Sequence, residues 1–136
     1  MGISPKGLDH LVLRTADVGR LADFYCRVLG CVREREVTTL GLTQLRAGAS
    51  LIDLVDAAGE IGRMGGAAPG GEALNLDHFC LRIDPWDEPA IRTHLAEHGV
   101  EAGPTEQRYG AEGQGPSIYL SDPDGNTVEL KGPPAS

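Results

Sequence analysis

The chain alternates short apolar runs with two amphipathic stretches. Residues 8–13 form an apolar run typical of a strand, and Asp17 follows as the expected N-cap of a helix. Apolar side chains then recur every three or four residues, which predicts one buried helix face made of Leu21, Phe24, Tyr25, Val28 and Leu29. Gly30 stands where that helix should end. Three more strands are predicted after it, over 32–37, 40–46 and 50–55.

The second half predicts the same order of elements. Residues 76–83 are expected to form a strand, and Asp84-Pro85 is the expected helix start because proline favours the first helical position. The pattern places four side chains on the buried face of that helix: Trp86, Ala90, Ile91 and Leu95. Gly99 should end the helix. Strands are then predicted over 100–102, 117–121 and 127–131, with a turn at 122–126.

A repeated motif explains why the two halves agree. Leu-Asp-His-Leu-Val-Leu-Arg at 8–14 returns as Leu-Asp-His-Phe-Cys-Leu-Arg at 76–82, so the two motifs lie 68 residues apart in a chain of 136. A repeat of this kind predicts one α+β domain over 1–136, built from two β-α-β-β-β modules. Module 1 is expected over about 6–57 and module 2 over about 75–132.

Two glycine-rich segments lie outside this pattern. Residues 58–74 should link the modules, either as a flexible linker or as a mobile flap over a ligand. Residues 103–116 should form an irregular loop. Because such loops often carry specificity, Arg108 and Tyr109 are candidate substrate-binding residues.

Strand alternation predicts which side chains share a face. His10 and Arg14 should point away from the leucines that pack under the helix, and His78 and Arg82 should do the same in module 2. In the last strand of each module an acid stands opposite apolar neighbours. If the polar faces curve into a cleft, the sequence predicts a metal or catalytic site from His10, Asp53, His78 and Glu129. The site could lie within one chain or between two.

Composition narrows the class of partners. The net charge of −8 repels phosphate backbones, so we expect no nucleic-acid partner. No run approaches the ~20 apolar residues needed to cross a bilayer, and residues 1–6 lack the apolar core of a signal peptide. The sequence therefore predicts a cytoplasmic protein without membrane partners, whose three cysteines are reduced.

These motifs resemble those of the vicinal oxygen chelate superfamily, which includes glyoxalase I, bleomycin resistance proteins, fosfomycin resistance enzymes and extradiol dioxygenases. The resemblance rests on LDHLVLR, FYCRVLG, LIDL, LDHFCLR and DPDGNTVEL. It implies a glyoxalase-like fold, in which two modules pair as cupped mixed sheets, and a homodimer. It also implies a divalent metal (Zn, Ni, Co, Mn or Fe) held by His10, Asp53, His78 and Glu129. Arg14 matches a position that helps hold the glutathione carboxylate in glyoxalase I, and Arg82 repeats it.

The ligand set is most similar to that of glyoxalase I. It implies a metal-dependent lyase or isomerase acting on a small α-oxo or α-hydroxy thiol adduct through a metal-stabilised enediolate, with Glu129 as the base. Two positions depart from glyoxalase I, because Asp53 replaces a glutamate and Ala57 replaces an asparagine that contacts glutathione. The alternatives are an extradiol-type iron dioxygenase, a thiol transferase of the fosfomycin-resistance kind, and a metal-free drug-binding protein like the bleomycin resistance proteins.

Overall fold

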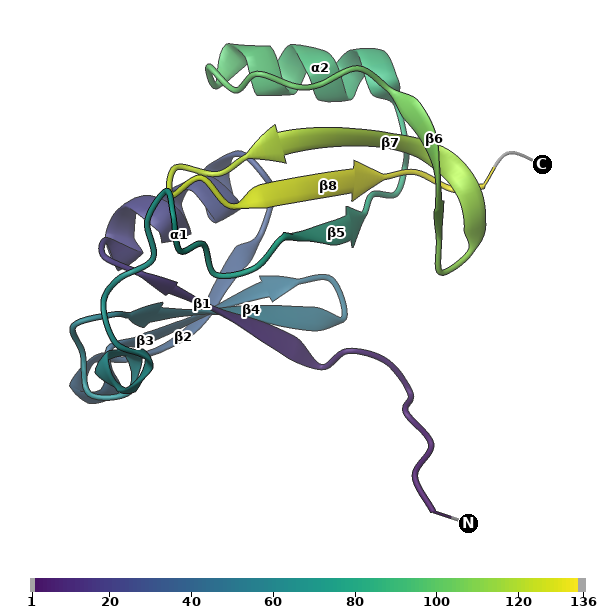
Figure 1. Ribbon diagram of the computed structural model, residues 1–136. Helices are drawn as coiled ribbons and strands as arrows, with labels where there is room; N and C mark the ends of the chain where they lie inside the picture. Colours follow the sequence, from purple (N-terminus) through teal and green to yellow (C-terminus); the bar gives the residue numbers. More distant parts are fainter. Residues whose placement is uncertain (1, 135–136) are drawn as a thin grey trace. The chain divides into compact units, whose positions relative to one another are not determined.

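The computed structural model describes residues 2–134 and divides the chain into two compact units, with the boundary between Asn75 and Leu76. Each unit holds one four-stranded mixed sheet and one α-helix (Figure 1). The predicted β-α-β-β-β order is confirmed in both units. The boundary lies directly after the predicted linker 58–74.

The first unit contains five regular elements and two 3₁₀ turns. In chain order they are β1 (His10–Thr15), α1 (Val18–Arg27), β2 (Val32–Val37), η1 (Thr38–Leu40), β3 (Leu42–Ala47), β4 (Ser50–Asp56) and η2 (Gly62–Gly65). The sheet order is β1-β4-β3-β2, with β1 and β4 parallel and the other pairs antiparallel. The first and last strands of the module therefore lie side by side.

The core of the first unit follows the predicted periodicities. Asp17 caps α1 by accepting a hydrogen bond from the backbone N–H of Arg20, and the chain turns at Gly30 with a positive φ of 78°. Leu21 and Tyr25 on α1 are fully buried, as is Leu13 on β1. Because the leucine face of β1 is the buried one, the opposite face presents His10, as alternation predicts.

The glycine-rich segment 58–74 is anchored to β1. Arg14 donates hydrogen bonds from its guanidinium to the carbonyl oxygens of Gly62, the first residue of η2, and Gly66, its C-cap. The side chain of Asn75 bonds both the N–H and the C=O of Arg14. A Cβ atom at Gly62 would lie 2.0 Å from the carbonyl oxygen of Asp56, so only glycine fits this docked turn. The structure thus favours a held segment over a freely flexible linker.

The second unit repeats the topology of the first. Its elements are β5 (His78–Arg82), α2 (Glu88–Glu97), β6 (Glu106–Gly110), β7 (Gly113–Ser121) and β8 (Thr127–Lys131). The sheet order is β5-β8-β7-β6, with β5 and β8 parallel. Helix α2 lies over one face of this sheet (Figure 1) and contributes the buried Leu95 to the core. The other face presents the alternate residues of β5, among them His78 and Arg82.

Three predictions about the second half are wrong. The helix starts at Glu88, not at Asp84-Pro85, because the side chain of Asp87 caps it through the N–H of Ala90. Ala90 is exposed, so it does not belong to the buried face. Residues 100–102 form no strand.

The segment 103–116 is also not irregular as predicted, because it forms β6 and the start of β7. Its polar and glycine-rich sequence hides the strands, which are held by antiparallel pairing of Arg108 with Gly115 and of its neighbours. Arg108 and Tyr109 therefore lie on a strand. In the part of the chain that the structure describes, neither helix is long and apolar enough to cross a membrane.

Candidate active site

A histidine–carboxylate pair lies on the polar face of the first unit. His10 begins β1, and its Nε2 lies 3.9 Å from Oδ2 of Asp53 on β4. Its other ring nitrogen, Nδ1, lies 2.8 Å from Oδ2 of Asp9. The hydrogen bond to Asp9, with the nearby charge of Asp53, raises the pKa of His10 above its usual value.

The carboxylate of this pair is buried and held. Asp53 is only 5% exposed, although it carries a charge. Its two oxygens each accept a hydrogen bond from Nε2 of Gln44, both at 3.1 Å, and Gln44 stands opposite Asp53 in the β3–β4 register. A buried carboxylate needs such donors, because an unpaired one would be costly. Gln44 therefore restricts the orientation of Asp53.

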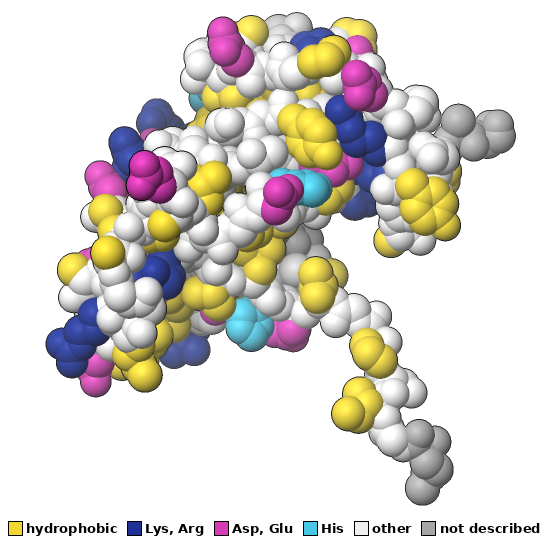
Figure 2. All heavy atoms as spheres, in the orientation of Figure 1, with side chains coloured by type: hydrophobic (Ala, Val, Ile, Leu, Met, Phe, Trp, Pro, Cys, Tyr) yellow, Lys and Arg dark blue, Asp and Glu magenta, His cyan; other side chains and the backbone are white. Residues whose placement is uncertain are grey.

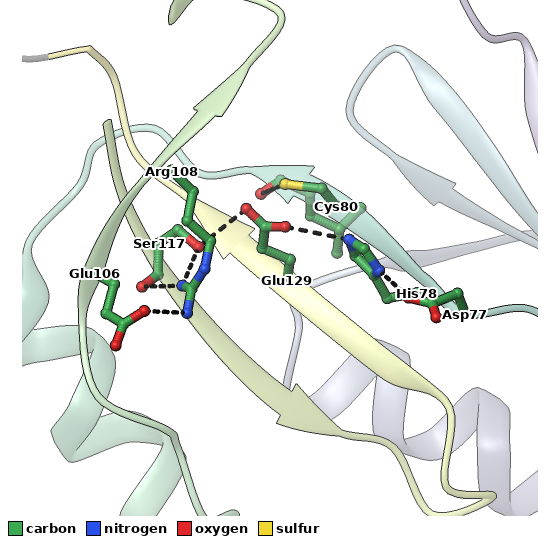
Figure 3. A network of polar contacts seen from close by, with 8 residues as sticks. Asp77, His78, Cys80, Glu106, Arg108, Ser117 and Glu129 are labelled. Atoms are coloured by element: carbon green, nitrogen blue, oxygen red, sulfur yellow. Dashed lines mark hydrogen bonds and ion pairs between the residues drawn. The ribbon is translucent and has the colours of Figure 1, made fainter. Parts of the chain in front are cut away.

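The second unit builds the same pair with a longer acid. Nε2 of His78 on β5 lies 3.4 Å from Oε1 of Glu129 on β8, and Nδ1 of His78 lies 2.6 Å from Oδ1 of Asp77 (Figure 3). The edge of the His78 ring meets Tyr119 with the ring centroids 5.5 Å apart. Figure 2 shows histidine side chains at the surface beside acidic ones, consistent with ring nitrogens that solvent and ligands can reach.

Ser117 and Arg108 support the Glu129 carboxylate through two successive hydrogen bonds. Glu129 is 6% exposed, and its Oε2 accepts a 3.0 Å hydrogen bond from the hydroxyl of Ser117. That hydroxyl in turn accepts a 2.7 Å hydrogen bond from Arg108, which also binds Glu106 and stacks over Tyr119 at 4.2 Å from the ring centroid. Figure 3 shows Glu129 between these two residues and His78. The Arg108 guanidinium thus polarises the Ser117 hydroxyl, which strengthens the hydrogen bond from that hydroxyl to the Glu129 carboxylate.

Cys80 lies beside this second pair, in surroundings that disfavour its thiolate form. Loss of water around its sulfur and the adjacent Glu129 carboxylate raise the pKa of the thiol to about 11, although part of the residue stays exposed. A thiol with this pKa is almost fully protonated at neutral pH, and the thiolate is the reactive form. Cys80 therefore acts as a neutral wall of the site.

The four side chains suit a divalent metal in donor chemistry. In each unit a carboxylate occupies Nδ1 of the histidine, which leaves the Nε2 lone pair for a ligand, as second-shell carboxylates do in metal proteins. Two ligands that each lie 2.0–2.2 Å from one ion are about 3.0–3.4 Å apart at common angles. The 3.4 Å separation of His78 Nε2 and Glu129 Oε1 meets this condition. The 3.9 Å separation in the first unit, where the acid is the shorter Asp53, is longer.

Each unit by itself holds two of the four candidate ligands. Among residues 2–134, no three side chains of His, Cys, Asp or Glu are grouped as a metal site. The convergence of all four residues therefore stays a prediction, and so does the assignment of the other candidates. Arg14 is engaged by the segment 58–74, and Arg82 pairs with Glu112 at 2.7 Å. Tyr109 is 79% exposed at the mouth of a cavity described below.

Sequence reasoning missed the residues that hold the ligands. Asp9 and Asp77 precede the two histidines in both copies of the repeat, so the repeat itself carried their signal. Gln44 and Ser117 left no such signal, because a polar residue in a strand is usually solvated and its partner is set by sheet register.

The family follows from comparison with known proteins. The family model described as the Glyoxalase/Bleomycin resistance protein/Dioxygenase superfamily matches residues 7–130, which include both histidine–carboxylate pairs. The chain belongs to this superfamily. The glyoxalase-like α+β fold is confirmed with it.

Curated relatives and solved structures of the superfamily span nearly the whole chain. Glyoxalase domain-containing protein RDO1 of Mycosarcoma maydis is 33% identical over 132 residues, covering 94% of this chain and 69% of the relative. Virulence protein STM3117 of Salmonella typhimurium is 31% identical over 127 residues, covering 90% and 81%. The crystal structure of STM3117 aligns with a TM-score of 0.81 over 97% of this chain and 100% of that one. A lactoylglutathione lyase from Agrobacterium tumefaciens, 21% identical, aligns with a TM-score of 0.66 over 94% of each chain and shares the fold.

Proposed function

We propose that this superfamily member is a divalent-metal-dependent lyase or isomerase of the glyoxalase I kind. The observation that carries the proposal is the duplicated arrangement of His10 with Asp9 and Asp53, and of His78 with Asp77 and Glu129. In both units a surface histidine is oriented by a carboxylate, and its Nε2 faces a buried acid. A solvated strand histidine requires neither feature, and finding both twice supports a ligand role.

His10, Asp53, His78 and Glu129 would together hold one ion per chain, of the Zn, Ni, Co, Mn or Fe class. Two imidazoles and two carboxylates suit these ions and leave positions for two neighbouring substrate oxygens. When bound, such an ion supplies Lewis acidity that stabilises negative charge on a carbonyl or hydroxyl oxygen of the substrate. The fit rests on the donor set and on the His78–Glu129 separation of 3.4 Å.

Glu129 is the residue of this chain that moves the proton. Its carboxylate is buried, is held on one oxygen by Ser117, and directs the other oxygen toward the exposed side of the sheet beside His78. On an α-hydroxy or α-oxo thiol adduct, Glu129 would take the proton from the carbon that bears the hydroxyl. It would return that proton to the neighbouring carbonyl carbon, while the hydroxyl proton passes to the former carbonyl oxygen, giving a 2-hydroxy thioester. The reaction is an internal redox isomerisation, so it needs no outside oxidant or reductant.

Asp53 is the more static acid of the two. Nε2 of Gln44 donates to both of its oxygens, which fixes the orientation of the Asp53 carboxylate. Glu129 has a longer side chain, with one oxygen held by Ser117 and the other facing His78, and the Cys80 thiol is a further neighbour of its carboxylate. We therefore assign Glu129 as the base and Asp53 as a ligand only.

Metal analysis and one kinetic assay test the proposal. The purified protein, stripped of metal and refilled separately with Ni, Co, Zn, Mn or Fe, should bind one ion per chain and isomerise the adducts of methylglyoxal with small thiols. H10A and H78A should each lose the ion, whereas the matched control H98A, at the C-cap of α2, should keep it. E129Q should lower kcat by about 10²- to 10⁴-fold.

The assay also separates the alternatives. Oxygen uptake with a catechol and ferrous iron, without isomerase activity, would assign an extradiol-type dioxygenase instead. Thiol addition to an epoxide would assign a transferase. A protein that binds no transition metal, and whose melting temperature a chelator leaves unchanged, would be a binding protein, and the proposed enzyme function would then be wrong.

A further inference from the structure

A buried lysine lies at one end of the candidate site in the second unit. The chain has only two lysines, Lys6 and Lys131. Lys6 is exposed, whereas Lys131, the last residue of β8, is only 6% exposed. Its Nζ donates one hydrogen bond, to the carbonyl oxygen of Gly113 at 3.1 Å. Within residues 2–134, no carboxylate lies within ion-pair distance of this ammonium group. Lysines are almost never buried without a partner, so this position calls for an explanation.

The β6–β7 hairpin is shaped to admit the lysine. A Cβ atom at Gly110 would lie 2.8 Å from Cε of Lys131, and one at Gly115 would lie 2.9 Å from its Nζ. Gly113 supplies the carbonyl that the ammonium binds. Three glycines therefore surround the lysine, and larger residues at two of them would force its side chain to move. The buried ammonium is accommodated by the local sequence.

The same lysine lines a cavity with the proposed base. The cavity has a volume of about 350 Å³, and its walls include His78, Cys80, Arg82, Tyr109, Glu129 and Lys131. Glu129 and Lys131 are alternate residues of β8 and so share its polar face. Arg82 is the register partner of Lys131, and Cys80 is that of Glu129. The cavity thus has a histidine–carboxylate end and, one strand repeat away, a cationic end.

Charge balance defines the kind of ligand. Arg82 is already neutralised, since its Nε binds Glu112 at 2.7 Å and a second nitrogen binds the carbonyl oxygen of Ile83. Lys131 is the cation of the cavity lining that pairs with no described carboxylate within ion-pair distance, although Glu129, two residues away on β8, lines the same cavity. A buried charge without a counter-ion is unfavourable, so an anion of one charge placed against the Lys131 ammonium, at the end of the cavity away from Glu129, would be bound favourably. A carboxylate carries that charge, whereas a phosphate dianion would leave one in excess.

We propose that Lys131 binds a carboxylate of the substrate, so that the enzyme acts on small α-oxo or α-hydroxy compounds that carry a carboxylate at the end remote from Glu129. The naming of a substrate class rests on the proposed function. The carboxylate site itself is formed by residues of the second unit alone and needs no metal. Lys131 is a binding residue here and transfers no proton.

Lysine-selective isotope labelling tests this site directly in the metal-free protein. Because there are two lysines, ¹³C-labelled lysine gives two side-chain Cε signals, and Lys6 is the internal control. Titration with glycolate should shift the Lys131 signal saturably and leave the Lys6 signal unchanged. Glycolamide, the neutral analogue, should bind at least 10-fold more weakly. The charged hydrogen bond lost in K131M should weaken glycolate binding about 10- to 100-fold, and K131R should restore part of it.

Each other outcome overturns the inference. Equal binding of glycolate and glycolamide would show that the cavity does not select an anion. Equal shifts of both lysine signals would show that the effect is ionic strength only. Saturable binding of inorganic phosphate without binding of glycolate would assign a different anion. G110A keeps the charge of Lys131 but displaces its side chain, so it should also weaken glycolate binding. This variant tests the inference if K131M fails to fold. The metal assay remains independent, so either proposal can fail alone.

Discussion

Replacing Ser117 by alanine should destabilise the second unit measurably. The hydroxyl of Ser117 is fully buried, donates to Glu129 at 3.0 Å and accepts from Arg108 at 2.7 Å. Hydrogen bonds to charged groups contribute about 1.5–3 kcal/mol, and an unsatisfied buried carboxylate oxygen adds a desolvation penalty. In S117A the Arg108 guanidinium still has its hydrogen bonds to the backbone carbonyl of residue 117 and to Glu106, and its contact with the Tyr119 ring. Arg108 therefore loses only one of its interactions. We therefore expect S117A to lower the free energy of unfolding by about 2 kcal/mol.

Urea denaturation followed by tryptophan fluorescence measures this loss of stability in the second unit, where Ser117 lies. The chain has a single tryptophan, Trp86, which belongs to the second unit. S121A, at an exposed position near the end of the same strand, is the matched control and should change stability by less than about 0.5 kcal/mol.

A double-mutant cycle assigns the loss to the Ser117–Glu129 contact. In an E129Q background the acceptor is uncharged, so S117A should cost only about 1 kcal/mol. If S117A falls within 0.5 kcal/mol of the wild type, or costs the same with and without the charge on Glu129, the hydrogen bond does not support the carboxylate and our account of Glu129 is wrong.

Three further outcomes follow from other contacts. D9N should lower the pKa of His10 in metal-free protein, measured by NMR titration. Since Asp9 raises the pKa of His10, the stability it adds is greatest below about pH 6.5. That stability should disappear as the pH rises through the folded-state pKa, and a D9N difference that grows with pH would contradict the assignment. R14M should free the segment 58–74, so that trypsin cuts after the exposed Arg63 about 5- to 30-fold faster, with R20M on α1 as the control. Burial raises the pKa of Cys31 to about 11, so Cys31 should resist iodoacetamide in native protein and react fully in urea, as mass spectrometry would show. Rapid native modification would refute its burial.

Much of the site could be predicted because alternation along a strand is a strong constraint. A strand that buries Leu13 must turn His10 to the other face, and the repeat transfers the same conclusion to His78. The positions of Asp53 and Glu129 follow from the same rule. The homodimer, the choice of metal and the convergence of the four side chains stay predictions.

The rest could not be predicted, because it depends on partners that are distant in sequence. Gln44 supports Asp53, and Ser117 supports Glu129, because the sheet register brings these residues together. The pattern of apolar residues does not predict that register. Strand β6 has no apolar alternation of its own and exists through pairing with β7. Lys131 lies on the same face of β8 as Glu129, because the two are alternate residues. From its residue type alone, a lysine at the end of a strand would be expected in solvent.

The parallel pairing of first and last strands also governs when the site can form during folding. His10 meets β4 across about 40 residues of sequence, and His78 meets β8 across about 50. Such non-local contacts form slowly, because loop closure must be completed before they contribute any stabilisation. A partly synthesised or partly folded module therefore carries a histidine without its acid. Each histidine–carboxylate pair is therefore complete only once the last strand of its module has joined the sheet.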